Sequence, residues 1–241
     1  MTNPIIKLEN ISFAYPGATE KILDSLSLEV YHGDRIGMMA PNGSGKTTLF
    51  HTIMGLCRPD SGTIEIFGSP VSTEQEFQAV RSRIGLMFQD ADDQLFCPTV
   101  VDDVAFGPLN LGLSADEARD RAREVLATLG IADLENAITH RLSGGQKRLV
   151  ALASVLAMEP SVLLLDEPTA GLDNGVKEKL VKILNHLDIS YVVISHEFNF
   201  LTAITDRVFS MESGKILSDD EVRIHQHEHM HKLGNHPHKH V

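Results

Sequence analysis

A glycine-rich loop between a short apolar run and a helical pattern constrains the fold of this 241-residue chain more than any other feature. The run Ile36–Met39 is typical of a buried strand, and a helical stretch begins at Lys46. In such a unit, backbone N–H groups and the amino end of the helix converge on phosphate. The sequence therefore predicts an α/β core that binds a nucleotide. The expected binding residues of the loop are Ala40, Pro41, Asn42, Gly43, Ser44, Gly45, Lys46, Thr47 and Thr48.

The loop matches the Walker A pattern, G-x-x-x-x-G-K-[ST], at every position except the first, where Ala40 replaces glycine. The pattern predicts that Lys46 reaches the β- and γ-phosphates of ATP and that Thr47 binds Mg²⁺. Alanine at the first position matters only if the backbone there needs a positive φ, which costs alanine about 1 kcal/mol. An accidental glycine-rich turn is the alternative, but the strand before the loop and the helix after it favour nucleotide binding.

Two adjacent carboxylates follow a second apolar run. Val162–Asp166 is typical of a buried strand, and Glu167 comes directly after it. Open α/β sheets bind ligands at the carboxyl edge of their strands, so both acids are expected near the phosphate loop. We expect Asp166 to belong to the Mg²⁺ shell and Glu167 to polarise the attacking water. Two solvated acids that begin a turn are the alternative, and the better one for an Asp-Glu pair without a Walker A loop.

The rest of the chain alternates short β-rich runs with longer helical patterns, which predicts a mainly parallel sheet covered on both faces. This rhythm stops between residues 91 and 158, where we expect two helices, begun by capping boxes at Ser114 and Ser143, and no strand. Residues 207–218 are expected to form a hairpin. The other expected elements are strands at 36–39, 84–88, 162–166 and 191–195 and helices from 46 and near 174–187.

The length suits one α/β domain with an inserted subdomain. We expect an ATP-binding core formed by residues 1–90 and 159–220, a helical subdomain at 91–158 and a tail at 221–241.

A short run discriminates among nucleotide-binding proteins: Leu142, Ser143, Gly144, Gly145 and Gln146. Alone, two glycines at a capped helix start would indicate only close packing. Between a Walker A loop and the Asp166-Glu167 pair, the run makes the chain resemble the nucleotide-binding subunit of ABC transporters, whose signature is LSGGQ. The resemblance spans about residues 5 to 218. It implies a P-loop NTPase core with a mainly parallel sheet, an inserted helical subdomain, an antiparallel β part and ATPase activity.

Four further positions match motifs of that family. The resemblance implies that Tyr15 stacks on adenine and that His196 contacts the γ-phosphate; an ordinary strand tyrosine and a satisfied core histidine are the alternatives. It also implies that Gln89 senses Mg²⁺ and the partner and that Asp173 belongs to the D-loop. Ala170-Gly171 stand where the family often has Ser-Ala. The D-loop assignment is therefore safer for Asp173 than for these two neighbours. The expected catalytic set is Glu167, His196 and Gln89, and the expected Mg²⁺ ligands are Thr47, Gln89 and Asp166.

The position of the signature predicts a dimer of ATPase subunits. A helix start at Ser143 is an anion site, because free N–H groups and the positive end of the helix dipole meet there. The Walker A loop already surrounds one side of the triphosphate, so the signature is expected to close on ATP held by a second subunit. ATP binding would then favour the closed dimer, and hydrolysis would release it.

The segment after Gln89 points to a membrane partner. The sequences DQLF-x-PTV at 93–100 and DVAFGP-x-N at 103–110 are similar to those of energy-coupling-factor importers of vitamins and transition metals. The resemblance implies that integral membrane transport subunits dock near 89–110, with Leu95 and Phe96 as apolar anchors for a coupling helix. Ordinary subdomain core is the alternative.

The sequence ends in a histidine-rich tail, which holds seven of the twelve histidines in its last seventeen residues. Neutral imidazoles at alternate positions suit Ni²⁺, Co²⁺, Cu²⁺ and Zn²⁺. Such ligands cannot select among these metals, so selectivity is expected in another subunit. One alternative is a purification tag, although tags are usually uninterrupted runs of histidine. Another is a merely soluble tail. The candidate ligands are His225, His227, His229, His231, His236, His238 and His240.

Composition limits the possible partners. The chain carries 33 acidic and 21 basic residues, a formal net charge of −12, which disfavours a nucleic-acid partner. The longest apolar run, 149–158, is shorter than the roughly 18 residues that a spanning helix needs, and no secretory signal is visible. The protein is therefore expected at the cytoplasmic face of the cell membrane, held there by partner subunits.

These features predict the ATP-hydrolysing subunit of an importer that takes up nickel or cobalt through partner transmembrane subunits. One alternative is the ATPase of an energy-coupling-factor importer for a vitamin or another solute. Another is a metal-storage or metal-sensing protein, which Glu167 and His196 argue against because both indicate hydrolysis. The expected cofactors are ATP and Mg²⁺, with Ni²⁺ or Co²⁺ on the tail.

Overall fold

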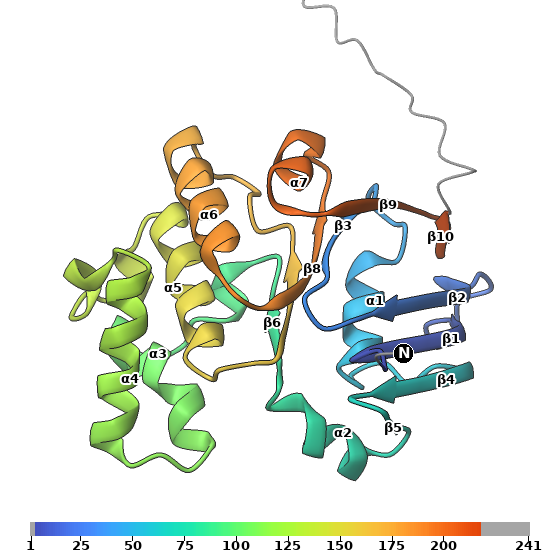
Figure 1. The fold of residues 1–241 in the computed structure, drawn as a ribbon, viewed down its shortest axis with the longest axis horizontal. Helices are drawn as coiled ribbons and strands as arrows, with labels where there is room; N and C mark the ends of the chain where they lie inside the picture. Colours follow the sequence, from blue (N-terminus) through green and yellow to red (C-terminus); the bar gives the residue numbers. More distant parts are fainter. Residues whose placement is uncertain (1–2, 218–241) are drawn as a thin grey trace, which may run out of the picture.

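The computed structural model describes residues 3–217, and its centre is a six-stranded sheet in the order β10-β9-β3-β8-β7-β6 (Figure 1). Strands β9, β3, β8, β7 and β6 run parallel, and β10 pairs antiparallel with β9 at one edge. Every side chain of β7 and β8 is buried, as apolar strands covered on both faces require. The bounds are β3 Arg35–Met39, β6 Ile84–Met87, β7 Val162–Asp166, β8 Ser190–Ser195, β9 Arg207–Glu212 and β10 Lys215–Leu217.

A second, antiparallel sheet has the order β2-β1-β4-β5. Strand β2 alternates buried apolar residues with exposed or half-exposed polar ones, so one face of this sheet packs on the core. Helix α1 (Lys46–Ile53) lies against both sheets, because Leu49 and Phe50 share one apolar cluster with side chains of β1 and β7. The bounds are β1 Ile6–Phe13, β2 Leu23–Val30, β4 Ser61–Ile66 and β5 Ser69–Pro70.

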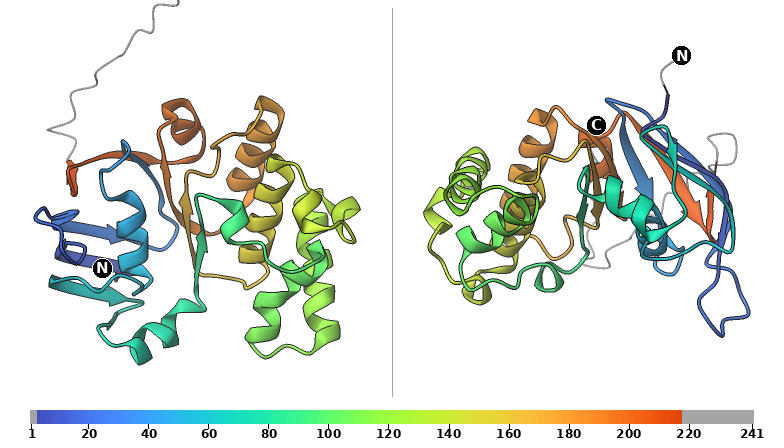
Figure 2. Two further views of the ribbon diagram at one scale, coloured as in Figure 1. Left: turned by 180° about the vertical axis from the view of Figure 1, so that it is seen from behind. Right: turned by 90° about the horizontal axis from the view of Figure 1, so that it is seen from below.

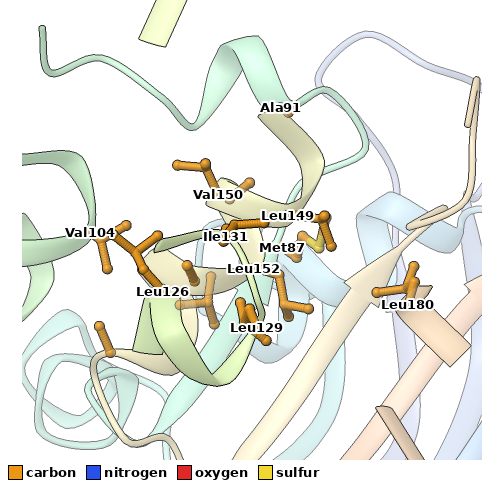
Figure 3. Packing of buried hydrophobic residues seen from close by; sticks show 14 of the residues in the cluster. Met87, Ala91, Val104, Leu126, Leu129, Ile131, Leu149, Val150, Leu152 and Leu180 are labelled. Atoms are coloured by element: carbon orange, nitrogen blue, oxygen red, sulfur yellow. The ribbon is translucent and has the colours of Figure 1, made fainter. Parts of the chain in front are cut away.

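A group of helices lies on the far side of the central strands from the antiparallel sheet (Figure 2). Its helices are α3 (Val100–Asn110), α4 (Ala115–Thr128) and α5 (Gly144–Leu156). Figure 3 shows the apolar cluster that joins them to the sheet, with Leu152 from α5, Leu126 from α4 and Met87 from β6. The remaining helices are α2 Glu74–Arg81, α6 Asn174–His186 and α7 Phe198–Ile204, with short 3₁₀ turns at Ala91–Asp93, Ala132–Leu134 and Thr139–Arg141.

The α/β architecture, the four expected strands of the parallel sheet and the β9–β10 hairpin agree with the expectation from the sequence, and the capping boxes at Ser114 and Ser143 are both present. The strands of the antiparallel sheet, β1, β2, β4 and β5, were not placed by the sequence. The prediction of only two helices between residues 91 and 158 is wrong, because α3 is a third one. The sequence did not predict α3 because it contains Gly107 and Pro108, and both residue types disfavour helix interiors. The start of α3 did carry a signal: Thr99 accepts a hydrogen bond from the backbone N–H of Asp102.

Between residues 3 and 217, no helix is both long enough and apolar enough to cross a membrane.

Leu152 tests how far the helices depend on the sheet for stability. Its side chain is fully buried where α5 meets β6, so Leu152→Ala should lower the free energy of unfolding by about 2–5 kcal/mol in urea titrations. Leu109→Ala on exposed α3 surface is the matched control and should change it by less than about 0.5 kcal/mol. Equal effects of the two variants would contradict this packing.

Candidate functional site

The phosphate loop connects β3 to α1 and depends on two glycines with positive φ. Gly43 has φ 80° and Gly45, the N-cap of α1, has φ 96°. A Cβ on Gly45 would lie 2.6 Å from the carbonyl oxygen of Ile22, so no larger residue fits there. Ala40 is buried and does not adopt a positive φ. The alanine at the first Walker A position is therefore unstrained.

Three of the expected site residues meet at this loop, one from the loop itself and two from distant parts of the chain. Lys46 Nζ is 2.7 Å from Glu167 Oε1, and His196 Nδ1 is 2.9 Å from Glu167 Oε2. Lys46 and Glu167 are buried, whereas most of the His196 side chain is exposed. Glu167 also has φ 48°, a strained backbone conformation that is concentrated at functional sites. One buried carboxylate thus links the loop to the end of β8.

Asp166 and Ser44 supply the oxygen atoms that a metal ion and a phosphate group need. Thr47 Oγ1 donates to Asp166 Oδ2 at 2.7 Å, so the two expected Mg²⁺ ligands lie side by side. Within residues 3–217, the buried Asp166 Oδ1 and Ser44 Oγ have no hydrogen-bond partner. Burial raises the pKa of Asp166, while the Thr47 hydroxyl and the Lys46 charge lower it. A hard cation such as Mg²⁺ prefers such oxygen ligands, so the residues present fit it.

Gln89 follows β6 and lines two cavities that border the loop. The larger, of about 630 Å³, also contacts Thr47 and Asp90, and the smaller, of about 360 Å³, also contacts Lys46 and Glu167. The structure therefore brings Gln89 to the same place as the loop and both carboxylates.

Tyr15 lies at the outer side of the loop. Its hydroxyl group is 3.1 Å from Thr48 Oγ1, and 44% of the residue is exposed. Phe13 holds the ring in an edge contact with centroids 5.0 Å apart. An exposed aromatic ring beside a phosphate loop is able to stack on a base.

The signature residues and Asp173 are not brought to the loop of their own chain. None of residues 142–146 lines either cavity at the loop. Ser143 and Gly144 are exposed at the start of α5, where Ser143 Oγ and the Gln146 side chain form a capping box. Asp173 is exposed and caps α6 by accepting from the Val176 N–H at 3.1 Å. Within residues 3–217 of one chain, the expected contacts of these residues with ATP are therefore not formed.

The expected docking segment forms an apolar surface. Phe96 is 64% exposed and contacts Phe106 of α3 edge to face, with centroids 4.6 Å apart. A cavity of about 360 Å³ lies beside them and is lined by Leu95, Phe96 and Pro98, among others.

The seven histidines of the tail lie outside the described residues. Within residues 3–217, no group of three His, Cys, Asp or Glu side chains is arranged to hold a metal ion.

Two residues of this region were missed by the sequence analysis. Arg148, on α5, is buried and donates to the backbone oxygens of Phe88 and Gln89, and burial lowers its pKa. Gln94 donates to the carbonyl oxygen of Ala151 on the same helix at 3.0 Å. The only sequence signal for Arg148 was its position two residues after the signature, and the only one for Gln94 was its position five residues after Gln89.

Comparison with known proteins identifies the family to which this chain is similar. The family model described as ABC transporter matches residues 23–170. The cobalt import ATP-binding protein CbiO of Rhodobacter capsulatus is 46% identical over 220 residues, which cover 90% of this chain and 78% of that protein. The energy-coupling factor transporter ATP-binding protein EcfA of Methanocaldococcus jannaschii is 41% identical over 219 residues, which cover 89% of this chain and 78% of that protein.

Solved structures share the fold. CbiO1 from Clostridium perfringens, described as part of the ABC transporter complex CbiONQ, has a TM-score of 0.80 at 37% identity, covering 90% of this chain and 88% of that one. A dimeric ATP-binding cassette in a post-hydrolysis state, bound to ADP and Pi, has a TM-score of 0.81 at 28% identity, covering 88% of this chain and 97% of that one.

Gly45→Ala tests the geometry of the phosphate loop. The added Cβ would collide with the Ile22 carbonyl group, so the affinity for ATP should fall by roughly tenfold or more, measured by titration calorimetry. Gly112→Ala is the matched control, because Gly112 also has a positive φ, 99°, but open space around its Cβ position. If both variants bind ATP like the wild type, the loop does not depend on Gly45.

Proposed function

This chain belongs to the ABC transporter family and is an ATPase, and from that premise we propose that it powers the uptake of a transition-metal cation, nickel or cobalt, through partner transmembrane subunits. The convergence of Lys46, Asp166 and Glu167 on the phosphate loop is the observation that carries the ATP-driven part. The cargo is supported by the similarity to a cobalt import ATP-binding protein and by the histidine-rich tail.

We propose that ATP lies along the loop of residues 40–48, with its base on Tyr15 and its terminal phosphates near Lys46. The amino end of α1 favours negative charge there, and the buried Ser44 hydroxyl adds a donor. Thr47, Asp166 and Gln89 would hold Mg²⁺. When bound, Mg²⁺ neutralises charge that develops on the phosphate oxygens.

Glu167 is the proposed general base, which accepts a proton from the attacking water. His196 orients its carboxylate through the 2.9 Å contact to Oε2. The Lys46 ammonium group contacts the other oxygen, so phosphate and Glu167 compete for the same donor. Transfer of Lys46 to the phosphate would leave Glu167 Oε1 free to accept the proton.

The exposed signature supports action as a dimer. Ser143 and Gly144 present the amino end of α5 to solvent rather than to the loop of their own chain. A second subunit would complete each ATP site from the opposite side, and Asp173 would contact it nearby. A structural neighbour is itself a dimeric cassette bound to ADP and Pi.

The surface around Phe96 and Phe106 is the proposed contact with the membrane subunits. A coupling helix of such a subunit would bury these two rings and enter the adjacent cavity. This contact would hold the chain at the cytoplasmic face of the membrane. The proposed helical subdomain, residues 91–158, carries both this surface and the signature.

An importer of a vitamin or another solute is the second candidate, because the energy-coupling factor transporter protein EcfA is also a relative. In that case the tail would only buffer metal. A storage or sensing role is less well supported, since the geometry at Glu167 favours hydrolysis.

Uptake of metal in cells that lack their own nickel and cobalt importers tests the proposal. The wild-type chain with its membrane subunits should accumulate Ni²⁺ or Co²⁺. Glu167→Gln keeps the size of the side chain but loses the base, so uptake should fall by about 10²-fold or more. Failure of both metals to accumulate while the wild-type complex hydrolyses ATP would contradict the cargo and favour the vitamin-type importer.

Deletion of residues 225–241 tests the tail separately. The deletion removes seven histidines, so Ni²⁺ binding to the purified chain should fall while the affinity for ATP stays within about twofold. Replacing the same seven histidines with Ser is the control for tail length. Loss of nucleotide affinity in either variant would mean that the tail supports the ATP site.

A further inference from the structure

A buried guanidinium group at the start of α5 connects three parts of the ATP site. Arg148 is 7% exposed and lies two residues after the signature. Its Nη1 donates to the carbonyl oxygens of Phe88 at 3.1 Å and Gln89 at 2.6 Å. Its Nη2 lies 3.4 Å from the carbonyl oxygen of Ala170. One side chain on the signature helix therefore holds both the loop after β6 and the turn after β7.

All three acceptors of Arg148 are backbone carbonyls, and no carboxylate within residues 3–217 forms an ion pair with it. Burial of this charge is costly and lowers the pKa of Arg148, although the more distant carboxylates of Asp90, Asp166 and Glu167 partly offset that cost. The planar fork of arginine, however, fixes two acceptors at a defined separation, which an apolar side chain cannot do. We therefore attribute the buried arginine to its ability to hold two backbone segments in place, and not to a gain in folding stability.

The two segments that Arg148 holds carry the groups needed for hydrolysis. Gln89 lines both cavities at the phosphate loop. The Ala170 N–H donates to the carbonyl oxygen of Glu167 at 3.1 Å, so Ala170 closes the turn that begins at Glu167. Two other α5 contacts, Lys147 with Asp92 and Gln94 with Ala151, reach only the segment after β6. Among the side chains of α5 within residues 3–217, Arg148 alone forms hydrogen bonds to both segments.

We propose that Arg148 is a positioning residue that couples the signature helix to the catalytic groups of its own subunit. When the signature closes on ATP of the second subunit, α5 moves Gln89 and the Glu167–Ala170 turn into position through the Arg148 side chain. Occupancy of one ATP site thereby prepares the other. The inference rests on the proposed roles of Gln89, Glu167 and the signature.

Arg148→Gln in the full-length chain tests this coupling. The kcat for ATP should fall by about tenfold or more, because Gln89 and Glu167 lose their common support. The Mg²⁺ concentration for half-maximal activity should rise, and the Hill coefficient for ATP should fall toward one. The affinity for a fluorescent ATP analogue should change by less than about threefold, because the hydrogen bonds of Arg148 go to Phe88, Gln89 and Ala170 and none goes to residues 40–48.

Two further variants keep the test decisive. Arg148→Lys retains the charge, but its single ammonium group cannot reach both segments, so its loss of kcat should be smaller and its Mg²⁺ requirement still raised. It carries the test if Arg148→Gln does not fold. Arg119→Gln, which removes an exposed guanidinium paired with Asp102, is the matched control and should behave as wild type.

A purely structural role predicts a different result: a lower Tm, with kcat per bound nucleotide, Mg²⁺ requirement and Hill coefficient unchanged. That outcome would overturn the proposal. In the double variant with Gln89→Ala, effects on the Mg²⁺ requirement should not add, and additive effects would also overturn it. If Gln89→Ala alone leaves the Mg²⁺ requirement unchanged, the proposed site is wrong and the role of Arg148 falls with it.

Discussion

The buried ion pair between Lys46 and Glu167 is the interaction on which the rest of the site depends. The two residues are 121 positions apart, and only the strand order β3-β8-β7 brings them together. The phosphate loop follows β3, His196 follows β8, and Glu167 follows β7, so three adjacent strands end at one edge. Parallel pairing fixes their register, with Met39 opposite Ser195 and Asp166 opposite Ile194. The parallel sheet therefore brings together Glu167, the proposed base, with His196 and Lys46.

The same arrangement leaves half of each ATP site open. The parallel sheet supplies the side where we propose that phosphate and Mg²⁺ bind, whereas the signature lies exposed on α5 and does not line the cavities at the loop. In the proposed dimer, the signature of one subunit would complete the ATP site at the loop of the other. Arg148 connects the two parts of the proposed site. It lies on α5, which presents the signature, and it donates to the backbone carbonyl groups of Gln89 and Ala170 beside the phosphate loop.

The sequence predicted those parts of the fold whose signals are local. The apolar runs of β7 and β8, the glycine loop and the two capping boxes each depend on neighbouring residues. Strand β1 was not predicted, because register shifts after Leu8 break the alternation of buried and exposed residues that marks a strand. Helix α3 was missed because Pro108 lies within it. Arg148 was missed because its hydrogen-bond acceptor, the Phe88 carbonyl oxygen, lies 60 positions earlier in the chain. No local sequence pattern indicates such a contact.

The central claim is that two copies of this chain complete each other's ATP sites, and light scattering of the full-length Glu167→Gln variant tests it most directly. In Mg²⁺ and ATP, the 26.5 kDa chain should double in mass and retain two ATP molecules per dimer. Adding Ser143→Arg to the same variant should return the monomer with ATP still bound, because only the exposed half-site is changed. A Glu167→Gln chain that stays monomeric while saturated with ATP would contradict the account.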